Sequence, residues 1–142
     1  DPLQQRGGWP PSRDQLYESA GPRPPDISPL QTDDDYPLIS LMQIEGLGFS
    51  EPAEGPQYLR DTELTFDGGG LPHNTSGGQL SVGQAGSAAG YLGLVESIRQ
   101  LTHRAADNQV AGARHAMVSG YGMINYDRGL CSAAAILAGG SA

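Results

Sequence analysis

The sequence predicts an α/β fold in which a mixed β-sheet is layered with helices. Apolar residues recur at helical spacing over Ser87–Thr102. Two short apolar segments near the end of the chain, His115–Ser119 and Cys131–Leu137, have the length and composition of buried strands. Because helical and strand segments alternate along the chain, the order of elements is typical of a layered α/β domain.

The first half of the chain is predicted to contain two helices and one short strand. Ser12–Ala20 is expected to form a short helix, and Asp26–Thr32 is expected to form a buried strand. Pro37 is tolerated in the first turn of a helix, so a second helix is predicted from this residue to about Leu47. Residues 48–70 are polar and rich in turn-forming residues, and no element is predicted there.

The strongest helix prediction covers Ser87–Thr102, where glycines in the first turns allow another backbone to approach closely. Five apolar residues in this segment follow helical spacing and are expected to face the core: Tyr91, Leu94, Val95, Ile98 and Leu101. The segment Gly120–Gly129, between the two late strands, is predicted to be a long loop.

Composition and charge limit the classes of function. The 142 residues are enough for one domain with its own core. The net charge is −8; residues 1–67 hold 13 acids against 4 Arg, a balance of −9, and residues 68–142 hold 3 acids against 4 Arg, a balance of +1. Nucleic acid is not an expected partner because phosphate contacts need clustered cations, and no apolar run approaches the ~20 residues of a membrane span.

The chain contains no Lys and a single cysteine, Cys131. The absence of Lys excludes Schiff-base catalysis by this segment, and one Cys excludes both an internal disulfide and a Cys-rich metal site. We therefore expect no metal and a reducing, cytoplasmic location.

The segment Asn74–Gly90 carries the most chemical information, because it is dense in Gly, Ser and Ala. Small residues before a helix leave backbone N–H groups free to face an anion or an oxyanion. The same composition is typical of a tight strand-to-helix turn packed against another element, so composition alone leaves both interpretations open.

The spacing in this segment resembles that of thiolases, in which Asn is followed after two residues by Gly-Gly and then by Gly-His-Pro. Four residues match this pattern: Asn74, Gly77, Gly78 and Gly83. Where thiolases carry the catalytic His and the following Pro, this chain has Gln84 and Ala85.

Two further segments are similar to thiolase motifs. Val118–Met123 resembles the Cys-x-Gly turn, with Val118 at the position of the acid/base Cys, and Asp33–Tyr36 falls on the Asn-Glu-Ala-Phe motif. The resemblance implies that residues 26–142 form the C-terminal half of a thiolase fold. Residues 1–25 would then be a loop-rich connection to an N-terminal half.

The missing His and Cys change the chemistry that the resemblance implies. Gln84 cannot act as a base near pH 7 and Val118 cannot move a proton, so Claisen condensation through an acyl-enzyme is not expected. Three segments are similar to the lipid-transfer-protein branch, also called the sterol carrier protein thiolase-like branch, which includes steroid side-chain-cleaving aldolases: residues 34–49, 71–81 and 119–131. This similarity implies retro-aldol cleavage of a β-hydroxyacyl-CoA, with coenzyme A as part of the substrate and no cofactor in this chain.

Two other functions stay open at the level of the sequence. One is a non-catalytic thiolase-fold subunit that binds acyl-CoA or lipid, and the other is an acetyl-CoA acetyltransferase-like acyltransferase that uses other residues. The resemblance also implies three kinds of partner, namely an N-terminal thiolase half, a second copy in a dimer, and a small protein with a zinc ribbon and an OB fold.

Retro-aldol cleavage needs a base for the β-hydroxyl proton and donors for the enolate oxygen. The predicted catalytic residues are Tyr121, three residues past Val118, with His73 and Tyr126, and the acids Asp33 to Asp35 are further candidates. The predicted substrate-binding residues are Asn74, Ser76, Gly77, Gly78, Gln84, Tyr36 and Gly120. Packing of an aromatic ring, a hydrogen-bonded His at a strand end and a solvated helix start are the structural alternatives for these residues.

Overall fold

The sheet contains parallel and antiparallel pairs, which confirms the predicted mixed sheet. The computed structural model describes residues 7–84, 86–125 and 128–140. In this part of the chain β1 (Leu30–Gln31) pairs in parallel with β2 (His115–Asn125), and β2 pairs antiparallel with β3 (Arg128–Ala138). The described α-helices are α1 (Pro10–Ala20), α2 (Pro37–Gly46), α3 (Gly55–Asp61), α4 (Gly78–Val82) and α5 (Gly90–Leu101). Short 3₁₀ helices lie at Pro24–Asp26, Gly86–Ala89 and Ala106–Asn108.

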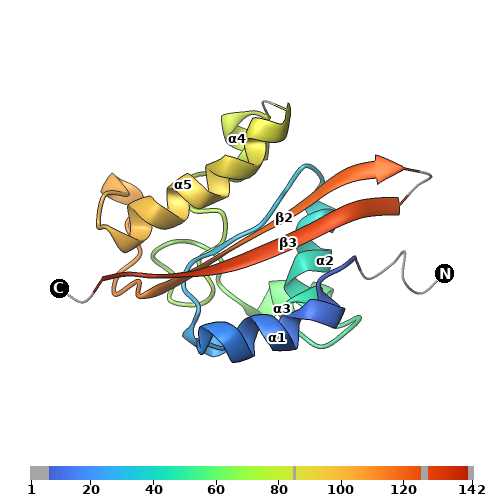
Figure 1. Cartoon of the computed structure of the whole chain (residues 1–142). Helices are drawn as coiled ribbons and strands as arrows, with labels where there is room; N and C mark the ends of the chain where they lie inside the picture. Colours follow the sequence, from blue (N-terminus) through green and yellow to red (C-terminus); the bar gives the residue numbers. More distant parts are fainter. Residues whose placement is uncertain (1–6, 85, 126–127, 141–142) are drawn as a thin grey trace.

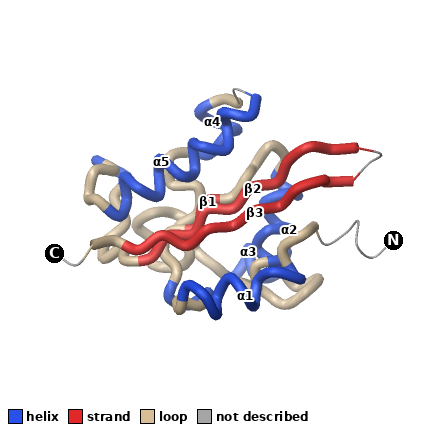
Figure 2. Tube along the Cα trace, viewed as in Figure 1, coloured by secondary structure: helices blue, strands red, loops and turns tan. Residues whose placement is uncertain are grey.

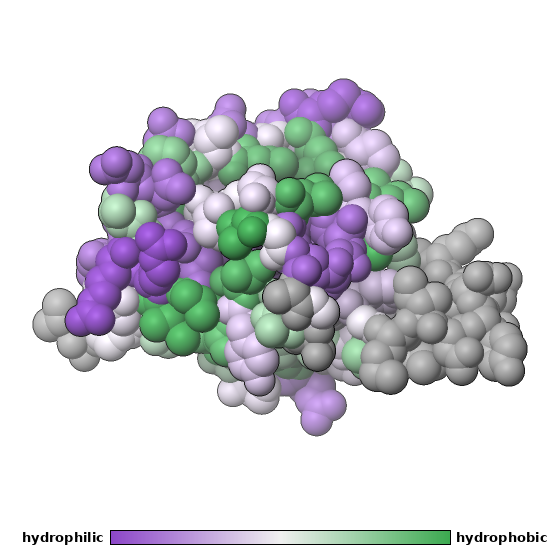
Figure 3. All heavy atoms as spheres, turned by 90° about the horizontal axis from the view of Figure 1, so that it is seen from above, coloured by the Kyte–Doolittle hydropathy of each residue, from purple (hydrophilic) through white to green (hydrophobic). Residues whose placement is uncertain are grey.

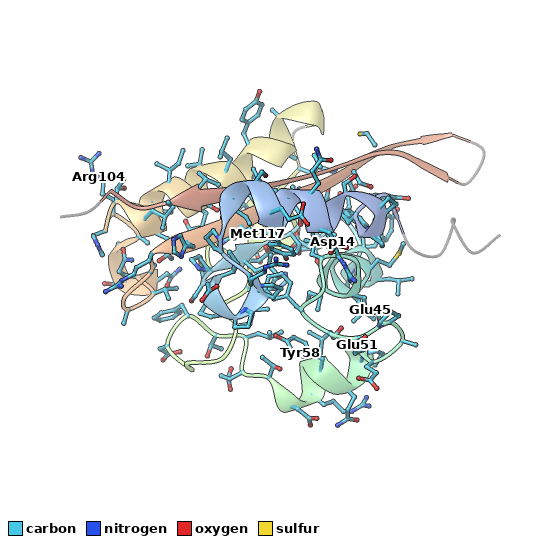
Figure 4. The ribbon with its side chains drawn as sticks, turned by 60° about the horizontal axis from the view of Figure 1, so that its bottom comes forward. Asp14, Glu45, Glu51, Tyr58, Arg104 and Met117 are labelled. Carbon is cyan, nitrogen blue, oxygen red and sulfur yellow. The ribbon has the colours of Figure 1, made fainter. Side chains whose placement is uncertain are left out.

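Helices cover both faces of the sheet. The helices α4 and α5 lie on one face, and α1, α2 and α3 lie on the other (Figures 1 and 2). The main apolar core is on the second face, where Met117 of β2 packs with Trp9, Ile44 and Leu47. Figure 4 shows Met117 in the middle of this side, close to α1.

The two helices predicted in the first half are confirmed as α1 and α2. Both begin with Pro, whose missing N–H costs nothing in the first turn of a helix. The buried Tyr17 of α1 donates a hydrogen bond of 2.7 Å to the carbonyl of Leu47, just after α2, and so ties the two helices together. Burial raises the pKa of Tyr17 to about 12, so its hydroxyl remains a donor at neutral pH.

The predicted strand Asp26–Thr32 is shorter than expected. Pro24–Asp26 forms a 3₁₀ helix, and only Leu30–Gln31 pairs as a strand. Prolines at 24, 25 and 29 have no backbone N–H, so they cannot donate to a ladder in this region.

The structure contains two short helices that were not predicted. One is α3, within the polar segment 48–70, and the other is α4, within the Gly-rich segment. The carboxylate of Glu45 accepts hydrogen bonds from the N–H groups of Ala53 (3.2 Å) and Gly55 (3.0 Å), which holds the start of α3 against α2. Figure 4 shows Glu45 and Glu51 on this side of the molecule.

The helix α5 is confirmed, but the prediction that its apolar stripe faces the core is wrong for three of the five residues. Leu101 is buried as predicted, and Leu94 is half-buried. Tyr91, Val95 and Ile98 are 65%, 52% and 46% exposed. The face that packs toward the sheet contains Gly93 and three buried polar residues, Glu96, Ser97 and Gln100. Helical spacing shows that one face is apolar, but it does not show which surface that face contacts.

The predicted loop Gly120–Gly129 is also wrong, because β2 and β3 continue into it as a long hairpin. Tyr121 pairs with Ser132 and Gly122 pairs with Cys131, and the ladder extends to Asn125. Three glycines in the segment favoured a loop, although alternation of small and large residues is compatible with a strand.

Candidate functional site

Some of the predicted site residues lie near the carboxyl end of β1. The loop Asp33–Tyr36 follows this strand directly, and His73 lies beside Leu30 in a parallel bridge. The N–H of Asn74 donates to the carbonyl of Leu30 at 3.0 Å. In open α/β sheets, ligands bind beyond the carboxyl ends of parallel strands, so this position suits a substrate site.

His73 belongs to a chain of hydroxyl groups. Its Nε2 lies 2.7 Å from Thr32 Oγ1, which lies 2.8 Å from Ser40 Oγ, and Ser40 donates to the carbonyl of Asp33 at 3.2 Å. Burial lowers the pKa of His73 to about 4, although the nearby carboxylate of Asp34 acts in the opposite direction. The imidazole is therefore neutral at pH 7 and has one nitrogen lone pair that can accept a proton.

Asp33 connects the loop to β2 and α2. Its carboxylate accepts the N–H of Asp35 at 3.1 Å and that of Tyr121 at 3.5 Å, and burial raises its pKa. The side chain of Gln43 donates to the Asp33 carbonyl at 2.7 Å and accepts from Ser119 Oγ at 2.7 Å. These contacts fix where the acidic loop begins.

Asp34 is the residue whose role the sequence did not indicate. Its side chain is 7% exposed, and its Oδ1 accepts the N–H of Gln79 at 2.7 Å. A Cβ on Gly78 would overlap Oδ2 of the same carboxylate. The sequence marked Asp34 only as one of three acids in a turn, whereas the structure shows that it anchors the Gly-rich turn.

The Gly-rich turn has a backbone that favours Gly, as expected. Gly77 and Gly78 have φ angles of 98° and 66°, in the region that side chains rarely adopt. Asn74 Oδ1 accepts the N–H of Thr32 at 2.8 Å, which fixes the orientation of the amide. Its Nδ2 is buried and has no partner among the described residues, so the amide has a free donor at the site.

A second group of polar residues, also missed by the sequence interpretation, holds the turn from the side of α5. Thr75 Oγ1 donates to Glu96 at 2.7 Å and accepts from Gln100 at 3.1 Å and from Gln31 at 3.2 Å. Glu96 is 2% exposed and pairs with Arg99 at 2.9 Å. Because Thr75 is 21 or more positions from Glu96, Gln100 and Gln31, no local pattern could have shown that they meet.

A known protein family matches almost the whole of this chain. The family described as Thiolase C-terminal domain-like matches residues 4–136. The chain belongs to this family. The thiolase-like segment spans about a quarter of the length of the curated relatives that it matches, for example 26% of the first one below.

Both lyases and acyltransferases are among the relatives of this thiolase-like chain. A 17-hydroxy-3-oxo-4-pregnene-20-carboxyl-CoA lyase from Mycobacterium tuberculosis is 36% identical over 105 residues, or 74% of this chain. A steroid side-chain-cleaving aldolase from Thermomonospora curvata is 35% identical over 105 residues, which cover 74% of this chain and 26% of the relative. An acetyl-CoA acetyltransferase from Methanothermobacter thermautotrophicus is 31% identical over 106 residues, which cover 75% and 27%.

A solved structure resembles the whole described fold. The Ltp2-ChsH2(DUF35) aldolase superimposes with a TM-score of 0.70 and 27% sequence identity, over 92% of this chain and 31% of that chain. The agreement covers both the sheet and the helices, so it supports the assignment to the thiolase-like fold independently of the motifs.

The structure separates Tyr121 from the position of the thiolase Cys. Val118 and Gly120 line a hollow next to α5, whereas the ring of Tyr121 lies on the other face of the sheet, 5.7 Å from the ring of Trp9. Residues three apart on a strand point to opposite faces, which explains this arrangement. Among the described residues, no hydrogen bond joins Tyr121 to His73.

The remaining predicted site residues are more open to solvent. Tyr36 is 64% exposed, Gln84 is exposed just after α4, and Ser76 is half-buried in the Gly-rich turn. Tyr126 and Ala85 lie outside the described residues. In the described ranges, no group of three or more His, Cys, Asp and Glu side chains could hold a metal ion. None of the helices described is long and apolar enough to span a membrane.

Proposed function

We propose that this chain is the C-terminal half of a carbon–carbon lyase that cleaves a β-hydroxyacyl-CoA thioester by a retro-aldol reaction. The supporting observation is that Gln84 and Val118 stand where thiolases carry His and Cys, while a neutral His73 and the Gly-rich turn remain at the site. The names of the lyase and aldolase relatives agree with this reaction. Acyl transfer is disfavoured because neither Gln84 nor Val118 can activate a nucleophile.

The reaction needs a base for the hydroxyl proton and hydrogen-bond donors for the enolate oxygen. The base takes the β-hydroxyl proton, the bond between the α and β carbons breaks, and its electron pair forms an enolate on the thioester. Protonation of the α carbon gives the shortened acyl-CoA, and the β carbon leaves as a ketone or aldehyde. His73, Tyr121 and Tyr126 are the proposed acid–base residues, and Asn74 Nδ2 with the turn at Gly77–Gly78 would donate to the enolate oxygen.

We propose that the function also requires an N-terminal thiolase half, fused to this chain or separate. The chain covers only 26% of its lyase relative, and the apolar residues Tyr91, Val95 and Ile98 of α5 are exposed. Leu80 and Val82 of α4 extend this surface, and Figure 3 shows apolar side chains spread over this side of the molecule. An obligate contact of this kind buries on the order of 2,000 Å² or more.

Further partners are proposed from the resemblance. A dimer is expected because thiolase-like proteins form dimers, and a zinc-ribbon/OB-fold protein is a further candidate because the aldolase of known structure contains a ChsH2(DUF35) component. The acyl-CoA substrate would supply coenzyme A, and we expect the assembly to work in the cytoplasm.

The test is a cleavage assay with the N-terminal half present. The substrate is 17-hydroxy-3-oxo-4-pregnene-20-carboxyl-CoA, the thioester after which the Mycobacterium tuberculosis relative is named. We expect equal amounts of a ring ketone and a shortened acyl-CoA. Binding without cleavage would instead support a non-catalytic acyl-CoA-binding subunit, and transfer of an acyl group to free CoA would support an acyltransferase.

Substitutions at Tyr121, His73 and Tyr126 test which residue transfers the proton. Tyr121→Phe is expected to keep binding and to lower kcat by about 10²-fold or more, the usual scale for one acid–base group or oxyanion donor. A tyrosinate base predicts activity that rises toward alkaline pH, and a protonated donor predicts a fall there. If kcat is unchanged, Tyr121 is a packing residue and His73→Gln and Tyr126→Phe become the deciding variants; Val118→Ala should have a much smaller effect.

A further inference from the structure

A chain of hydrogen bonds links His73 to the acidic loop through two hydroxyl groups. Nε2 of His73 lies 2.7 Å from Oγ1 of Thr32, and this oxygen lies 2.8 Å from Oγ of Ser40. Oγ of Ser40 lies 3.2 Å from the carbonyl oxygen of Asp33. A hydroxyl group has one proton to donate, so each of the two hydroxyls can supply the proton of only one of these three contacts.

The carbonyl oxygen at the end of the chain fixes the direction of all three hydrogen bonds. Because a carbonyl has no proton to donate, Ser40 donates its proton to Asp33. Thr32 then donates to Ser40, and this uses the only hydroxyl proton of Thr32. The remaining contact therefore needs a proton on Nε2 of His73. The other tautomer, with the proton on Nδ1, would leave one of the three contacts without a proton.

The chain of hydrogen bonds is buried and its far end is fixed. Thr32 and Ser40 are both buried, and so is Gln43, whose side chain donates a second hydrogen bond of 2.7 Å to the Asp33 carbonyl. Gln43 also accepts a hydrogen bond of 2.7 Å from Ser119 of β2, which ties this end to the sheet. Since an amide carbonyl cannot pass a proton on, the chain orients the imidazole but offers no route for a proton to leave.

Nδ1 of His73 keeps its lone pair in this arrangement. In the part of the chain that the structure describes, no hydrogen bond occupies Nδ1, and the residue itself is half-buried, whereas Thr32 and Ser40 are buried. Burial lowers the pKa of His73, so the ring is neutral before the reaction, while the nearby carboxylate of Asp34 favours the imidazolium that forms when Nδ1 takes a proton. Nδ1 therefore has the chemical character of a base.

We propose that Thr32 and Ser40 are positioning residues that hold His73 in its Nε2–H tautomer and leave Nδ1 as the atom that takes the β-hydroxyl proton. This inference rests on the lyase function proposed above. The proton moves from the hydroxyl oxygen to Nδ1, the carbonyl of the ketone forms, and the electron pair of the broken carbon–carbon bond moves to the enolate. Because the chain of hydrogen bonds ends at a carbonyl, the α carbon is then protonated from Nδ1 and not along that chain.

Nitrogen NMR of the histidines, with the N-terminal half present, tests the tautomer directly. The protonated and unprotonated nitrogens of a neutral imidazole give well-separated signals. The chain contains 3 His, so comparison with His73→Gln identifies the signals of His73. Near neutral pH we expect a proton on Nε2 and none on Nδ1, and a proton on Nδ1 instead would overturn the inference.

Ser40→Ala separates a positioning role from a merely structural one. Without Ser40, the proton of Thr32 loses its acceptor and can be donated to Nε2 of His73, so the Nδ1–H tautomer should appear. We expect kcat to fall about tenfold or more and KM to change less than about twofold, because Nδ1 would no longer be free to take a proton. Ser97→Ala removes a buried hydroxyl that has no partner among the described residues, so this matched control should change neither tautomer nor kcat.

Two results with Ser40→Ala would overturn the inference while the wild-type protein still cleaves its substrate. An unchanged tautomer would show that Thr32 and Ser40 do not position the ring, and a changed tautomer with unchanged kcat would show that Nδ1 is not the base. Thr32→Val keeps the shape of the side chain without its hydroxyl and serves if Ser40→Ala does not fold. The signal of Nε2 should then move because its proton loses the acceptor, kcat should fall, and an unchanged kcat would again overturn the inference.

Failure of the proposed function gives a different result. If the wild-type protein with its N-terminal half does not cleave the thioester, the lyase function is refuted, and with it the role of Nδ1 as the base. The NMR spectrum of the wild-type protein needs no turnover, so it still decides whether Thr32 and Ser40 hold His73 in the Nε2–H tautomer.

Discussion

The ionisation of His73 is coupled to the folded structure. Its Nε2 contacts Thr32 at 2.7 Å, and burial lowers its pKa from 6.5 to about 4. A group with a lowered pKa contributes stability that is fully present above its unfolded value, here about pH 6.5, and lost as the pH falls through about 4. The shift corresponds to roughly 3 kcal/mol at most.

We therefore predict that acid destabilises this chain between pH 6.5 and 4 and that His73→Gln weakens this dependence. Gln can hydrogen-bond to Thr32 but does not titrate. The free energy of unfolding, measured with denaturant at several pH values, should fall less steeply in the variant. Asp33, whose pKa is raised by burial, contributes in the opposite direction and is present in both proteins. Identical slopes in variant and wild type would contradict the assignment.

The contact between the Asp34 carboxylate and the Gly-rich turn gives a second prediction. Gly78→Ala introduces a Cβ that overlaps the Asp34 carboxylate, at a φ of 66° that Ala adopts poorly. We expect a loss of about 1–3 kcal/mol in unfolding free energy. Gly120→Ala is the control, because its Cβ would meet nothing within 4 Å and its φ is not positive. Equal stability of both variants would mean that the turn is free to move away from Asp34.

At the level of single residues, the sequence indicated where the Gly-rich turn lies but not which side chains contact it. The spacing of Asn74, Gly77 and Gly78 indicated the turn, and all three lie at the site. The anchoring role of Asp34 depends on a contact across 45 positions with Gln79, which no local pattern contains. The catalytic roles of His73, Tyr121 and Tyr126 stay predictions.

At the scale of elements, α5 has a polar face toward the sheet and an apolar face toward solvent. The sequence predicted the helix from its 3.6-residue period but assigned the apolar face to the core of this chain. Because Gln31 and Thr75 present polar groups under the helix, the complementary face of α5 is the one with Glu96 and Gln100. Leu94 is half-buried beside an open hollow, so Leu94→Asp is not expected to prevent folding.

The network under α5 gives the third prediction. Glu96→Leu leaves the buried Thr75 hydroxyl without an acceptor and removes one of the bonds of Gln100, whose side chain still donates to the carbonyl of Asn108, so we expect a loss of about 2–4 kcal/mol. Glu96→Gln keeps one acceptor oxygen and should cost about 1 kcal/mol, because the pair with the half-exposed Arg99 contributes little. Thermal and denaturant unfolding of the two variants distinguish these values. Similar losses would show that the charge, rather than the hydrogen bonds, stabilises the network.

At the scale of the whole molecule, one side of the sheet is closed and the other is open. The core on the side of α1 and α2 buries Trp9, Ile44 and Met117, all at 3% exposure or less. The side of α4 and α5 leaves Tyr91, Val95 and Ile98 in contact with solvent. The sequence predicted the layers but not this asymmetry, because helical spacing shows that one face of α5 is apolar without showing what that face contacts.

The asymmetry leads to the last prediction, which concerns assembly. In Val95→Asp/Ile98→Asp, two carboxylates replace apolar groups on an exposed surface, so this chain should keep its own fold. They would become buried without a partner when an N-terminal half covers α5, which costs several kcal/mol for each charge. Co-elution with that half in size-exclusion chromatography should therefore be lost. Gln15→Asp, on the exposed side of α1 across the sheet, adds the same kind of charge and should leave assembly intact. Co-elution that survives the double substitution would show that the apolar ridge of α5 is not the contact surface, and the N-terminal half would then have to bind elsewhere.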